Sequence, residues 1–449
     1  MTLRPGTSTP ATSTSRRLVI VVRADPVICG HSGEARNLAE VALRRGFDDV
    51  RILTWPIDRL VESGLPMKPL DGVLPYSAGI VVERPEPVGD YKVPDGRYLA
   101  GLVGRLVELF TDGVPTVCMS LYLSPHAMAV AEAIRTAEST GLPSSVATIA
   151  EAVGSDITNV VRSCVAEGRF GAAAHALSTY LGNDLCVAVS QYTKDLIVSS
   201  ALEIDAVHGT GFADRCRERV EISYPAVDTV SYLEVTPQVT GQVLAARGLV
   251  PGGYVLFLSR LAHAKGVDEL ISGFAMSRMS ERHTLVIAGN GPQEQWLRTI
   301  AADSPVADRI VFLTDVDDYE KPYLMAGCAA YVLPSKPRPE FIETFGIALV
   351  EKMLAGGGPV ITTDTGGIGE AVGNCALMVG IEDPVAIAAA LDGVLAMPEE
   401  ERELMAVRAR QHALQFDRGR VFDLLMEKLE AKVGASQPPP TVVGVTTPV

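Results

Sequence analysis

The stretch "YVLFLSRLAHAKGVDELISGFAM" (residues 254–276) sets the fold. Residues 254–258 form an unbroken apolar run after two glycines, and this pattern predicts a buried strand. From Val267 onward, apolar residues recur at the three- and four-residue spacing of a helix. A strand followed by a helix is the repeating unit of an α/β protein with a parallel sheet.

The same alternation fills both halves of the chain, and it predicts a covered parallel sheet in each half. In the first half, strands are expected at 17–23, 50–55, 78–84, 115–121, 144–150, 184–190 and 219–225. In the second half, they are expected at 254–260, 283–289, 309–315, 329–335, 359–364 and 376–380. Helical stretches separate most of them, the first at residues 33–45.

A polar stretch with Pro237 and Gly241 interrupts this alternation and indicates a domain boundary. The predicted organisation is a disordered tail (1–15), an N-terminal Rossmann-like domain (16–235), a C-terminal Rossmann-like domain (236–415), a helix that can return to the first domain (416–433) and a second disordered tail (434–449). A cleft between two such domains is the expected ligand site, because strand carboxyl ends and helix amino ends face it.

Composition excludes several classes of protein. The net charge of −15 over 449 residues disfavours nucleic-acid binding. The seven cysteines are scattered and form no C-x-x-C pair, which argues against a disulfide frame or a zinc site and suits a reducing cytoplasm. Neither a targeting segment nor an apolar stretch near the ~20 residues of a membrane helix is seen. A cytoplasmic protein without stable membrane insertion is expected, and its oligomeric state is open.

Two cations follow the first strand of the second half. Arg260 stands at the end of the strand, and Lys265 stands just before the next helix. Both could reach a diphosphate in the cleft, Arg as a planar fork and Lys as a point charge. Each alone could equally be a solvated surface cation, but their shared place at a strand end in an acidic protein favours the anion site.

Two other motifs of the second half carry less information. Gly289 and Gly291 form a G-x-G between a strand and a helix, which turn formation alone would explain. Asp315 and Asp317 form a D-x-D, but acids between a strand and a helix are often turn and capping residues, so no metal site is expected.

Residues 343–367, "ETFGIALVEKMLAGGGPVITTDTGG", carry the strongest local signal. A helix can begin at Phe345 or Gly346, and its free amides and dipole favour an anion. Glu343 lies just before this helix and Glu351 lies within it, on either side of the anion pocket. Spacing alone leaves open whether they are a capping acid and a surface acid or a clamp for sugar hydroxyls. The Gly366–Gly367 pair after the next strand favours the clamp.

In the first half, Gly30 and Gly33 give a phosphate-compatible turn between the first strand and the first helix. His31 lies in that turn, and His126 lies at another junction of strand and helix. A lone histidine is usually structural or solvated, but the carboxyl end of a strand should face the cleft.

These motifs together resemble the family-4 retaining glycosyltransferases of the GT-B fold. Residues 258–274 resemble the family's G-R-L-x-x-x-K-G stretch, with Ser259 in the glycine position. "LVIAGNGPQ" (285–293), "VLPS" (332–335) and "PVITTDTGGIGEAV" (359–372) follow in family order, and "SYPAVD" (223–228) resembles its pre-linker segment. The E-x7-E signature corresponds to Glu343 and Glu351. The resemblance extends from about Leu185 to Ala390.

The resemblance implies two Rossmann-like domains that face an interdomain cleft, and transfer of a sugar from a nucleotide-diphosphate sugar with retention and without a metal or other cofactor. Arg260 and Lys265 would neutralise the diphosphate, and Glu351 would bind the ribose. Glu343 and His126 would contact the donor sugar. Further donor contacts would come from Gly33, Gly289, Phe345, Gly346, Ile347, Gly366 and Gly367. UDP-sugars are the favoured donors.

Two positions depart from the family pattern. Thr344 replaces a glycine of the acid-Gly-Phe-Gly run, and "TIAEAVG" (148–154) lacks the family's histidine, with Glu151 as a substitute. His31 and Glu151 are candidates for the acceptor site. Arginine outnumbers lysine about threefold, typical of a GC-rich bacterial gene, for which sugar or natural-product aminocyclitol acceptors are plausible. A GT-B epimerase, a pseudo-glycosyl coupling enzyme and a non-catalytic nucleotide-sugar-binding protein remain alternatives.

Overall fold

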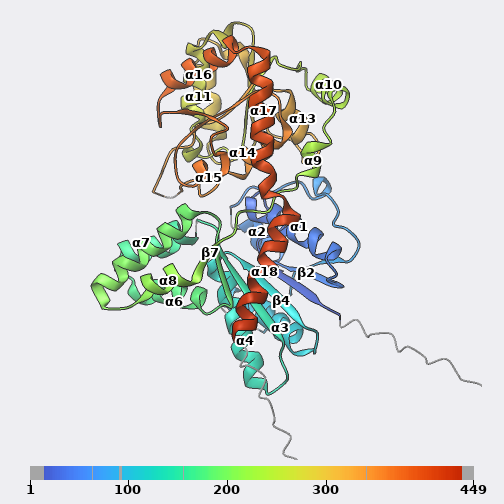
Figure 1. Ribbon diagram of the computed structural model, residues 1–449, viewed down its shortest axis with the longest axis vertical. Helices are drawn as coiled ribbons and strands as arrows, with labels where there is room; N and C mark the ends of the chain where they lie inside the picture. Colours follow the sequence, from blue (N-terminus) through green and yellow to red (C-terminus); the bar gives the residue numbers. More distant parts are fainter. Residues whose placement is uncertain (1–14, 63, 90–93, 155, 340, 437–449) are drawn as a thin grey trace, which may run out of the picture.

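Two parallel sheets, one in each half of the chain, build the protein (Figure 1). The computed structural model describes residues 15–436 except 63, 90–93, 155 and 340. The first sheet has the strand order β3-β2-β1-β4-β5-β6-β7 and the second has the order β10-β9-β8-β11-β12-β13. The two expected disordered tails lie outside the described residues, apart from residues 15 and 434–436.

Every strand expected from the sequence is present. The strands of the first sheet are β1 (Arg17–Val21), β2 (Asp49–Leu53), β3 (Ile80–Glu83), β4 (Thr116–Leu121), β5 (Val146–Ala152), β6 (Leu185–Ala188) and β7 (Val220–Ile222). Those of the second are β8 (Tyr254–Leu258), β9 (Thr284–Ala288), β10 (Ile310–Leu313), β11 (Ala330–Leu333), β12 (Val360–Thr363) and β13 (Leu377–Val379). The interior strands β1, β6 and β11 are buried along their whole length, because helices cover both faces of each sheet.

Helices connect the strands and lie on both faces of the sheets (Figure 1). Those of the first half are α1 (Gly30–Arg44), α2 (Ile57–Glu62), α3 (Pro94–Thr111), α4 (Met128–Thr140), α5 (Arg162–Ala166), α6 (Phe170–Leu181), α7 (Gln191–His208) and α8 (Phe212–Arg219). Those that follow are α9 (Val230–Leu233), α10 (Pro237–Ala246), α11 (Val267–Met276), α12 (Glu294–Ala302), α13 (Lys321–Gly327), α14 (Ile347–Ala355), α15 (Ile368–Val372), α16 (Pro384–Ala396), α17 (Glu399–Ala413) and α18 (Arg418–Ser436).

The chain crosses between the domains twice, and the two crossing segments pair with each other. Val227 N donates to Phe416 O at 2.9 Å, and Arg418 N donates to Val227 O at 2.9 Å. Tyr232 already packs in the core of the second domain, so the first crossing lies before residue 235. The second crossing leads into α18, which runs down the first domain beside α1 (Figure 1).

Helix α18 is part of the core of the N-terminal domain. Its apolar side chains Val421, Phe422, Leu425 and Leu429 are buried with residues of β1 and α1. The helix ends at Ser436, so residues 434–436 of the expected tail are helical. The apolar face of α18 is thus buried against the N-terminal domain. About four hundred residues of sequence separate β1 of that domain from α18.

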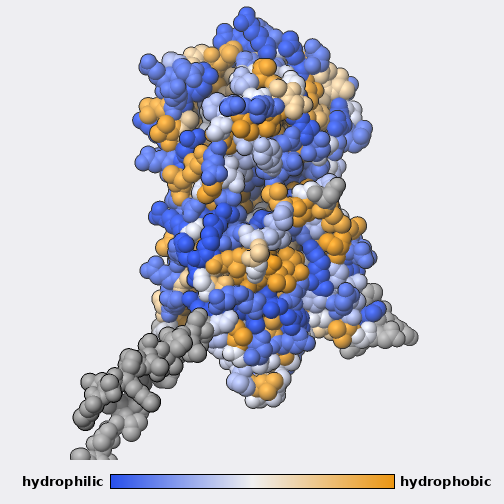
Figure 2. Space-filling model, turned by 90° about the vertical axis from the view of Figure 1, so that its right-hand side faces the viewer, coloured by the Kyte–Doolittle hydropathy of each residue, from blue (hydrophilic) through white to orange (hydrophobic). Residues whose placement is uncertain are grey.

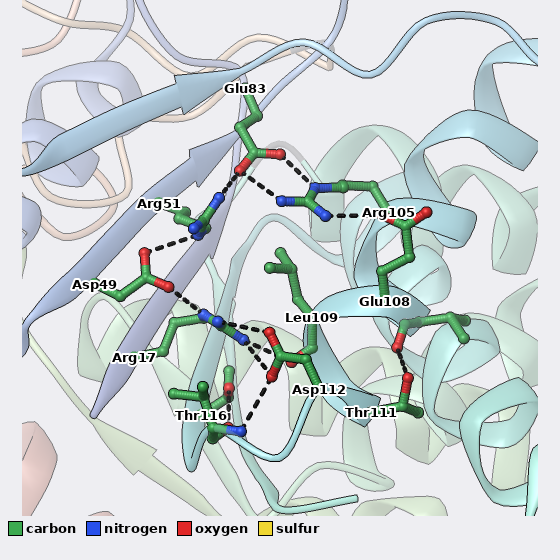
Figure 3. A network of polar contacts seen from close by, with 12 residues as sticks. Arg17, Asp49, Arg51, Glu83, Arg105, Glu108, Leu109, Thr111, Asp112 and Thr116 are labelled. Atoms are coloured by element: carbon green, nitrogen blue, oxygen red, sulfur yellow. Dashed lines mark hydrogen bonds and ion pairs between the residues drawn. The ribbon is translucent and has the colours of Figure 1, made fainter. Parts of the chain in front are cut away.

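A network of ion pairs fixes α3 to β1, β2 and β3 of the N-terminal sheet (Figure 3). The Arg17 side chain is 5% exposed, pairs with Asp49 at 2.6 Å and Asp112 at 2.7 Å, and donates to Leu109 O at 2.7 Å. Arg105 of α3 pairs with Glu83 nearer the surface. Arg17 is therefore the buried centre of the network, because Asp49, Asp112 and the Leu109 carbonyl all contact its guanidinium group.

We expect Arg17→Met to lower the free energy of unfolding of the N-terminal domain by ~3 kcal/mol, because it removes the buried guanidinium from Asp112 and Leu109 O, while Asp49 keeps its ion pair with Arg51. The melting temperature in thermal unfolding should fall by several degrees. Arg105→Met is the matched control, because its side chain is 31% exposed, and it should cost less than ~1 kcal/mol. Equal losses in both variants would contradict a special role for the buried arginine.

Exposed apolar side chains gather on the N-terminal domain, which is the lower part of the face drawn in Figure 2. Several exposed large apolar residues of this domain come from residues 61–99: Val61, Leu70, Leu74, Val81, Val88 and Leu99. Among the described residues, no helix combines the length and apolarity needed to cross a membrane.

Candidate functional site

Arg260 and Lys265 converge on one aromatic ring that the sequence did not single out. The Arg260 guanidinium carbon lies 5.4 Å from the centre of the Phe341 ring, and Lys265 Nζ lies 5.0 Å from it. Lys265 is also ion-paired to Glu343. Arg260, Lys265, Glu343 and His126 are the four residues predicted to be catalytic. The first three are thus brought together at the carboxyl end of β8.

The two cations of this cluster differ in their partners. The Lys265 and Glu343 side chains are 9% and 12% exposed, so their ion pair is largely withdrawn from solvent. Arg260 is half-buried, and no ion pair joins it to any described acid. A half-buried guanidinium without an acidic partner leaves positive charge available for an anion at this edge of the sheet.

The glycines near this cluster allow close contacts between loops. A Cβ atom on Gly289, whose φ is +128°, would overlap Ser259 O in the loop that carries Arg260. A Cβ atom on Gly366 would overlap Glu343 O, and Gly367 N donates to Glu343 O at 2.9 Å. These three glycines therefore fix the loops that carry the charged side chains, and a direct contact with a donor stays a prediction.

Helix α14 begins at Ile347, next to the expected start, and Gly346 caps it with a φ of +97°. Phe345 is 2% exposed and stacks on Tyr224 at 5.5 Å between ring centres. It also packs edge-on against Phe416 at 5.0 Å. Tyr224 and Phe416 belong to the two crossing segments, so the amino end of this helix is held by the interdomain connection.

Glu351 lies within α14 and has two partners from outside the helix. Its carboxylate pairs with Lys321 of α13 and hydrogen-bonds to Tyr232 of α9. The side chain is 13% exposed. Both acids of the E-x7-E signature are therefore engaged and largely buried, unlike solvated helix residues, and ribose binding by Glu351 stays a prediction.

Helix α1 begins at Gly30, three residues earlier than expected, because the two glycines and the histidine of its first turn resemble a loop in sequence. A Cβ atom on Gly30 would lie 3.0 Å from Cδ1 of Ile347. Apart from its own chain neighbours and helix backbone, no described atom lies within 4 Å of the place that a Cβ atom on Gly33 would take. The amino end of α1 thus meets the amino end of α14 across the domain boundary.

His31 and His126 lie in an aromatic cluster around Tyr122, where β1 and β4 end, and His31 is partly exposed. His126 is 1% exposed and packs against Trp55 at 4.7 Å and Tyr122 at 5.7 Å between ring centres. Burial, aided by the charge of Arg23, lowers the pKa of His31 to about 3 and lowers the pKa of His126 well below its ordinary value. Both imidazoles are therefore neutral at neutral pH.

Glu151 is fully buried at the carboxyl end of β5, where it lies against Glu34 of α1. Glu34 accepts a hydrogen bond of 3.0 Å from Ala226 N in the first crossing segment. Burial raises the pKa of Glu34 to about 7 and raises that of Glu151 well above its ordinary value. The pair therefore holds a proton at neutral pH, next to the interdomain connection.

This carboxyl pair predicts a pH dependence of stability. The folded protein binds the proton of Glu34 more tightly than the unfolded chain does, so the stabilisation is complete below the ordinary pKa of 4.5 and is lost as the pH rises through about 7. We expect Glu151→Gln to remove much of the loss of stability that accompanies rising pH. Melting temperatures of both proteins, measured between pH 5 and 8, should converge or cross as pH rises, and parallel curves would contradict the assignment.

Three contacts close the two domains over the site. Thr344 Oγ1 donates to Val153 O at 2.9 Å, and the carboxylate of Glu370 accepts from Gln191 N at 2.8 Å at the start of α7. Lys68 pairs with Asp318 at 2.6 Å from the other domain. Thr344, which departs from the family pattern, thus serves in domain contact, and its methyl group fills the space that a Cβ atom on Gly154 would need.

Two acids of residues 314–319 form structural ion pairs or hydrogen bonds. Asp315 pairs with Arg247 at 2.9 Å, and Asp317 accepts backbone hydrogen bonds from Tyr319 and Glu320 as a turn and capping residue. Within the described ranges, no group of three or more His, Cys, Asp or Glu side chains is placed to hold a metal ion.

Comparison with known proteins finds a family match within the second half of the chain. Residues 251–412 match the family described as "Glycosyl transferases group 1". A glycogen synthase of Mycobacterium tuberculosis is 34% identical over 193 residues, which cover 41% of this chain and 44% of that protein. A GDP-mannose-dependent alpha-(1-6)-phosphatidylinositol monomannoside mannosyltransferase of Mycolicibacterium smegmatis is 30% identical over 263 residues, 56% of this chain and 65% of that protein. The match thus spans less than two thirds of each relative.

Solved structures extend the likeness of fold to nearly the whole chain. The structure of Anabaena Alr3699/HepE in complex with UDP and glucose aligns with a TM-score of 0.66 and 17% identity, over 92% of this chain and 99% of that one. At this identity the alignment establishes a shared architecture of two α/β domains.

Proposed function

We propose that this chain, whose residues 251–412 match the family of group 1 glycosyl transferases and whose two domains have the GT-B fold, is a retaining hexosyltransferase. It would transfer a sugar from a nucleotide-diphosphate sugar to a small polar acceptor such as a sugar or cyclitol. UDP-sugars are the favoured donors, because UDP and glucose occupy the structure of similar fold, whereas the mannosyltransferase relative uses GDP-mannose.

The observation that carries this function is the half-buried guanidinium of Arg260, which forms no ion pair with a described acid and lies with Lys265 beside the Phe341 ring. The Glu343 side chain of the same cluster adjoins Gly346, the amino-terminal cap of α14. Arg260 and the first amides of that helix offer positive charge to one site, in a protein of net charge −15. Lys265 adds a second cation when Glu343 turns to the hydroxyls of a donor sugar. A diphosphate joined to a sugar fits this arrangement, because the two cations can bind the diphosphate while Glu343 binds the sugar hydroxyls.

The proposed mechanism is front-face substitution without a metal. The bond between the anomeric carbon and the diphosphate oxygen breaks, and the acceptor oxygen bonds to the same face of that carbon. An oxygen of the departing diphosphate takes the acceptor's proton, so no protein nucleophile is needed. Arg260 and Lys265 stabilise the charge that develops on the diphosphate, and domain closure positions the two substrates.

The test begins with thermal unfolding of the purified protein in the presence of UDP-, GDP-, ADP- and dTDP-sugars. A donor that binds the folded state raises the melting temperature according to its concentration and affinity. We expect the largest rise with a UDP-sugar, together with slow release of UDP in the absence of acceptor. If no nucleotide sugar changes the melting temperature and none is hydrolysed, the function is wrong. An altered sugar nucleotide without coupled product would favour an epimerase.

A further inference from the structure

Arg23 is a half-buried arginine without an acidic partner at the cleft edge of the N-terminal sheet. It follows β1, and its guanidinium carbon lies 4.7 Å from the centre of the Tyr122 ring, which follows β4. Among the described residues, no carboxylate forms an ion pair or a hydrogen bond with it. In a chain with 54 acidic residues, such a cation leaves its charge available to a ligand.

The acids nearest to Arg23 in sequence or at the same sheet edge are already neutralised. Asp25 pairs with Arg36 at 2.7 Å and with Lys68 at 3.3 Å. Burial and the neighbouring Glu34 raise the pKa of Glu151 well above its ordinary value, so this carboxyl group is neutral at neutral pH. Among the described residues, the positive charge of Arg23 is therefore not compensated by a carboxylate, since Asp25 is paired with other cations and Glu151 is neutral.

Several polar atoms around Arg23 are buried without a hydrogen-bond partner. They are Nδ1 of His31, both ring nitrogens of His126 and Oγ of Ser120, all within the described part of the first domain. Ser120 pairs in register with Val21, two residues before Arg23. Buried polar atoms usually find partners, so this group of atoms indicates a ligand that supplies them.

The same cluster faces the donor side of the cleft. His31 directly follows Gly30, where an added Cβ atom would lie 3.0 Å from the side chain of Ile347, the first residue of α14. A molecule bound at Arg23 and His31 would therefore lie beside a sugar held at the amino end of α14. That is the place of an acceptor in the proposed reaction.

We propose that Arg23, with His31 and His126, binds a phosphate or carboxylate group on the acceptor, so that the acceptor is an anionic sugar or cyclitol. A guanidinium holds such a group through two parallel hydrogen bonds, and the neutral imidazoles and the serine hydroxyl can donate further ones. A cationic aminocyclitol would be repelled. This inference rests on the proposed glycosyl transfer.

The experiment compares hexose and inositol monophosphates and hexuronates with their neutral parent compounds, in the presence of UDP. For the native chain, we expect an anionic member to raise the melting temperature and its neutral parent to have little effect. Arg23→Gln should remove this rise. Arg16→Gln is the matched control, because Arg16 also lies over an aromatic ring, Phe47 at 4.6 Å, just before the opposite end of β1.

Kinetics with the best anionic compound then separate acceptor from donor. Arg23→Gln should raise the KM for the acceptor at least ~tenfold, which corresponds to ~1.4 kcal/mol of lost binding, and change the KM for the nucleotide sugar less than ~twofold. If the donor KM rises instead, Arg23 binds the donor's diphosphate and the inference is wrong. It is also wrong if nucleotide sugars bind but no anionic compound surpasses its neutral parent. Absence of nucleotide-sugar binding would instead refute the proposed function.

Discussion

We expect Arg260→Met to lower kcat by about 10²–10³-fold and to change the KM for the donor less. Arg260 supplies charge that is needed most when the diphosphate departs, and removal of one preorganised group of this kind has effects of that size. The guanidinium has no ion pair to lose among the described residues, so folding should be little affected. Steady-state kinetics and the melting temperature of the variant measure both effects.

Two variants serve as controls for Arg260→Met. Arg298→Met removes an arginine that also lies over an aromatic ring, Phe312 at 4.5 Å, but whose side chain is 42% exposed on α12. Asp317→Ala removes the turn acid of residues 314–319. Both should retain kcat within ~twofold. Near-normal turnover in Arg260→Met, measured beside these controls, would refute its role at the diphosphate.

The Lys265–Glu343 ion pair gives the second large effect, and it separates stability from catalysis. Lys265→Met should lower kcat at least ~tenfold, since a cation near the diphosphate is lost. It should also destabilise the C-terminal domain by ~3 kcal/mol, because Glu343 stays largely buried without its partner. Thermal unfolding and steady-state kinetics report the two losses separately.

The double variant Lys265→Met/Glu343→Gln completes the cycle. We expect it to recover much of the melting temperature, because no buried charge is left unpaired, and to recover none of the turnover. Glu343→Gln alone should raise the donor KM, because an amide is a weaker acceptor for sugar hydroxyls than a carboxylate. Recovery of turnover in the double variant would show that Lys265 acts only by neutralising Glu343.

Local sequence patterns were sufficient to predict the fold, because each depends on residues a few positions apart. All thirteen strands coincide with the apolar runs, and α14 begins one residue after Gly346. The start of α1 was wrong by three residues, because Gly30 and Gly33 disfavour a helix intrinsically while the adjoining domain holds them in one.

The partners of the site residues could not be predicted, because they are set by packing of distant loops. The Glu34–Glu151 pair joins α1 to β5, and its stability depends on burial that neither local sequence reveals. Phe341 follows a proline-rich loop and had no distinguishing pattern, although it lies beside both predicted cations. Arg23 resembled the polar end of a strand, and only the absence of a described acidic partner distinguishes it.

The return of α18 to the N-terminal domain has a consequence for biosynthesis. Domains usually fold in the order in which the ribosome produces them. Here the core of the first domain includes Phe422 and Leu425, so it stays incomplete until nearly all of the second domain has been translated. The nascent N-terminal domain therefore exposes an apolar groove beside α1 throughout that interval, a surface of the kind that chaperones bind, and the domain made second can finish folding first.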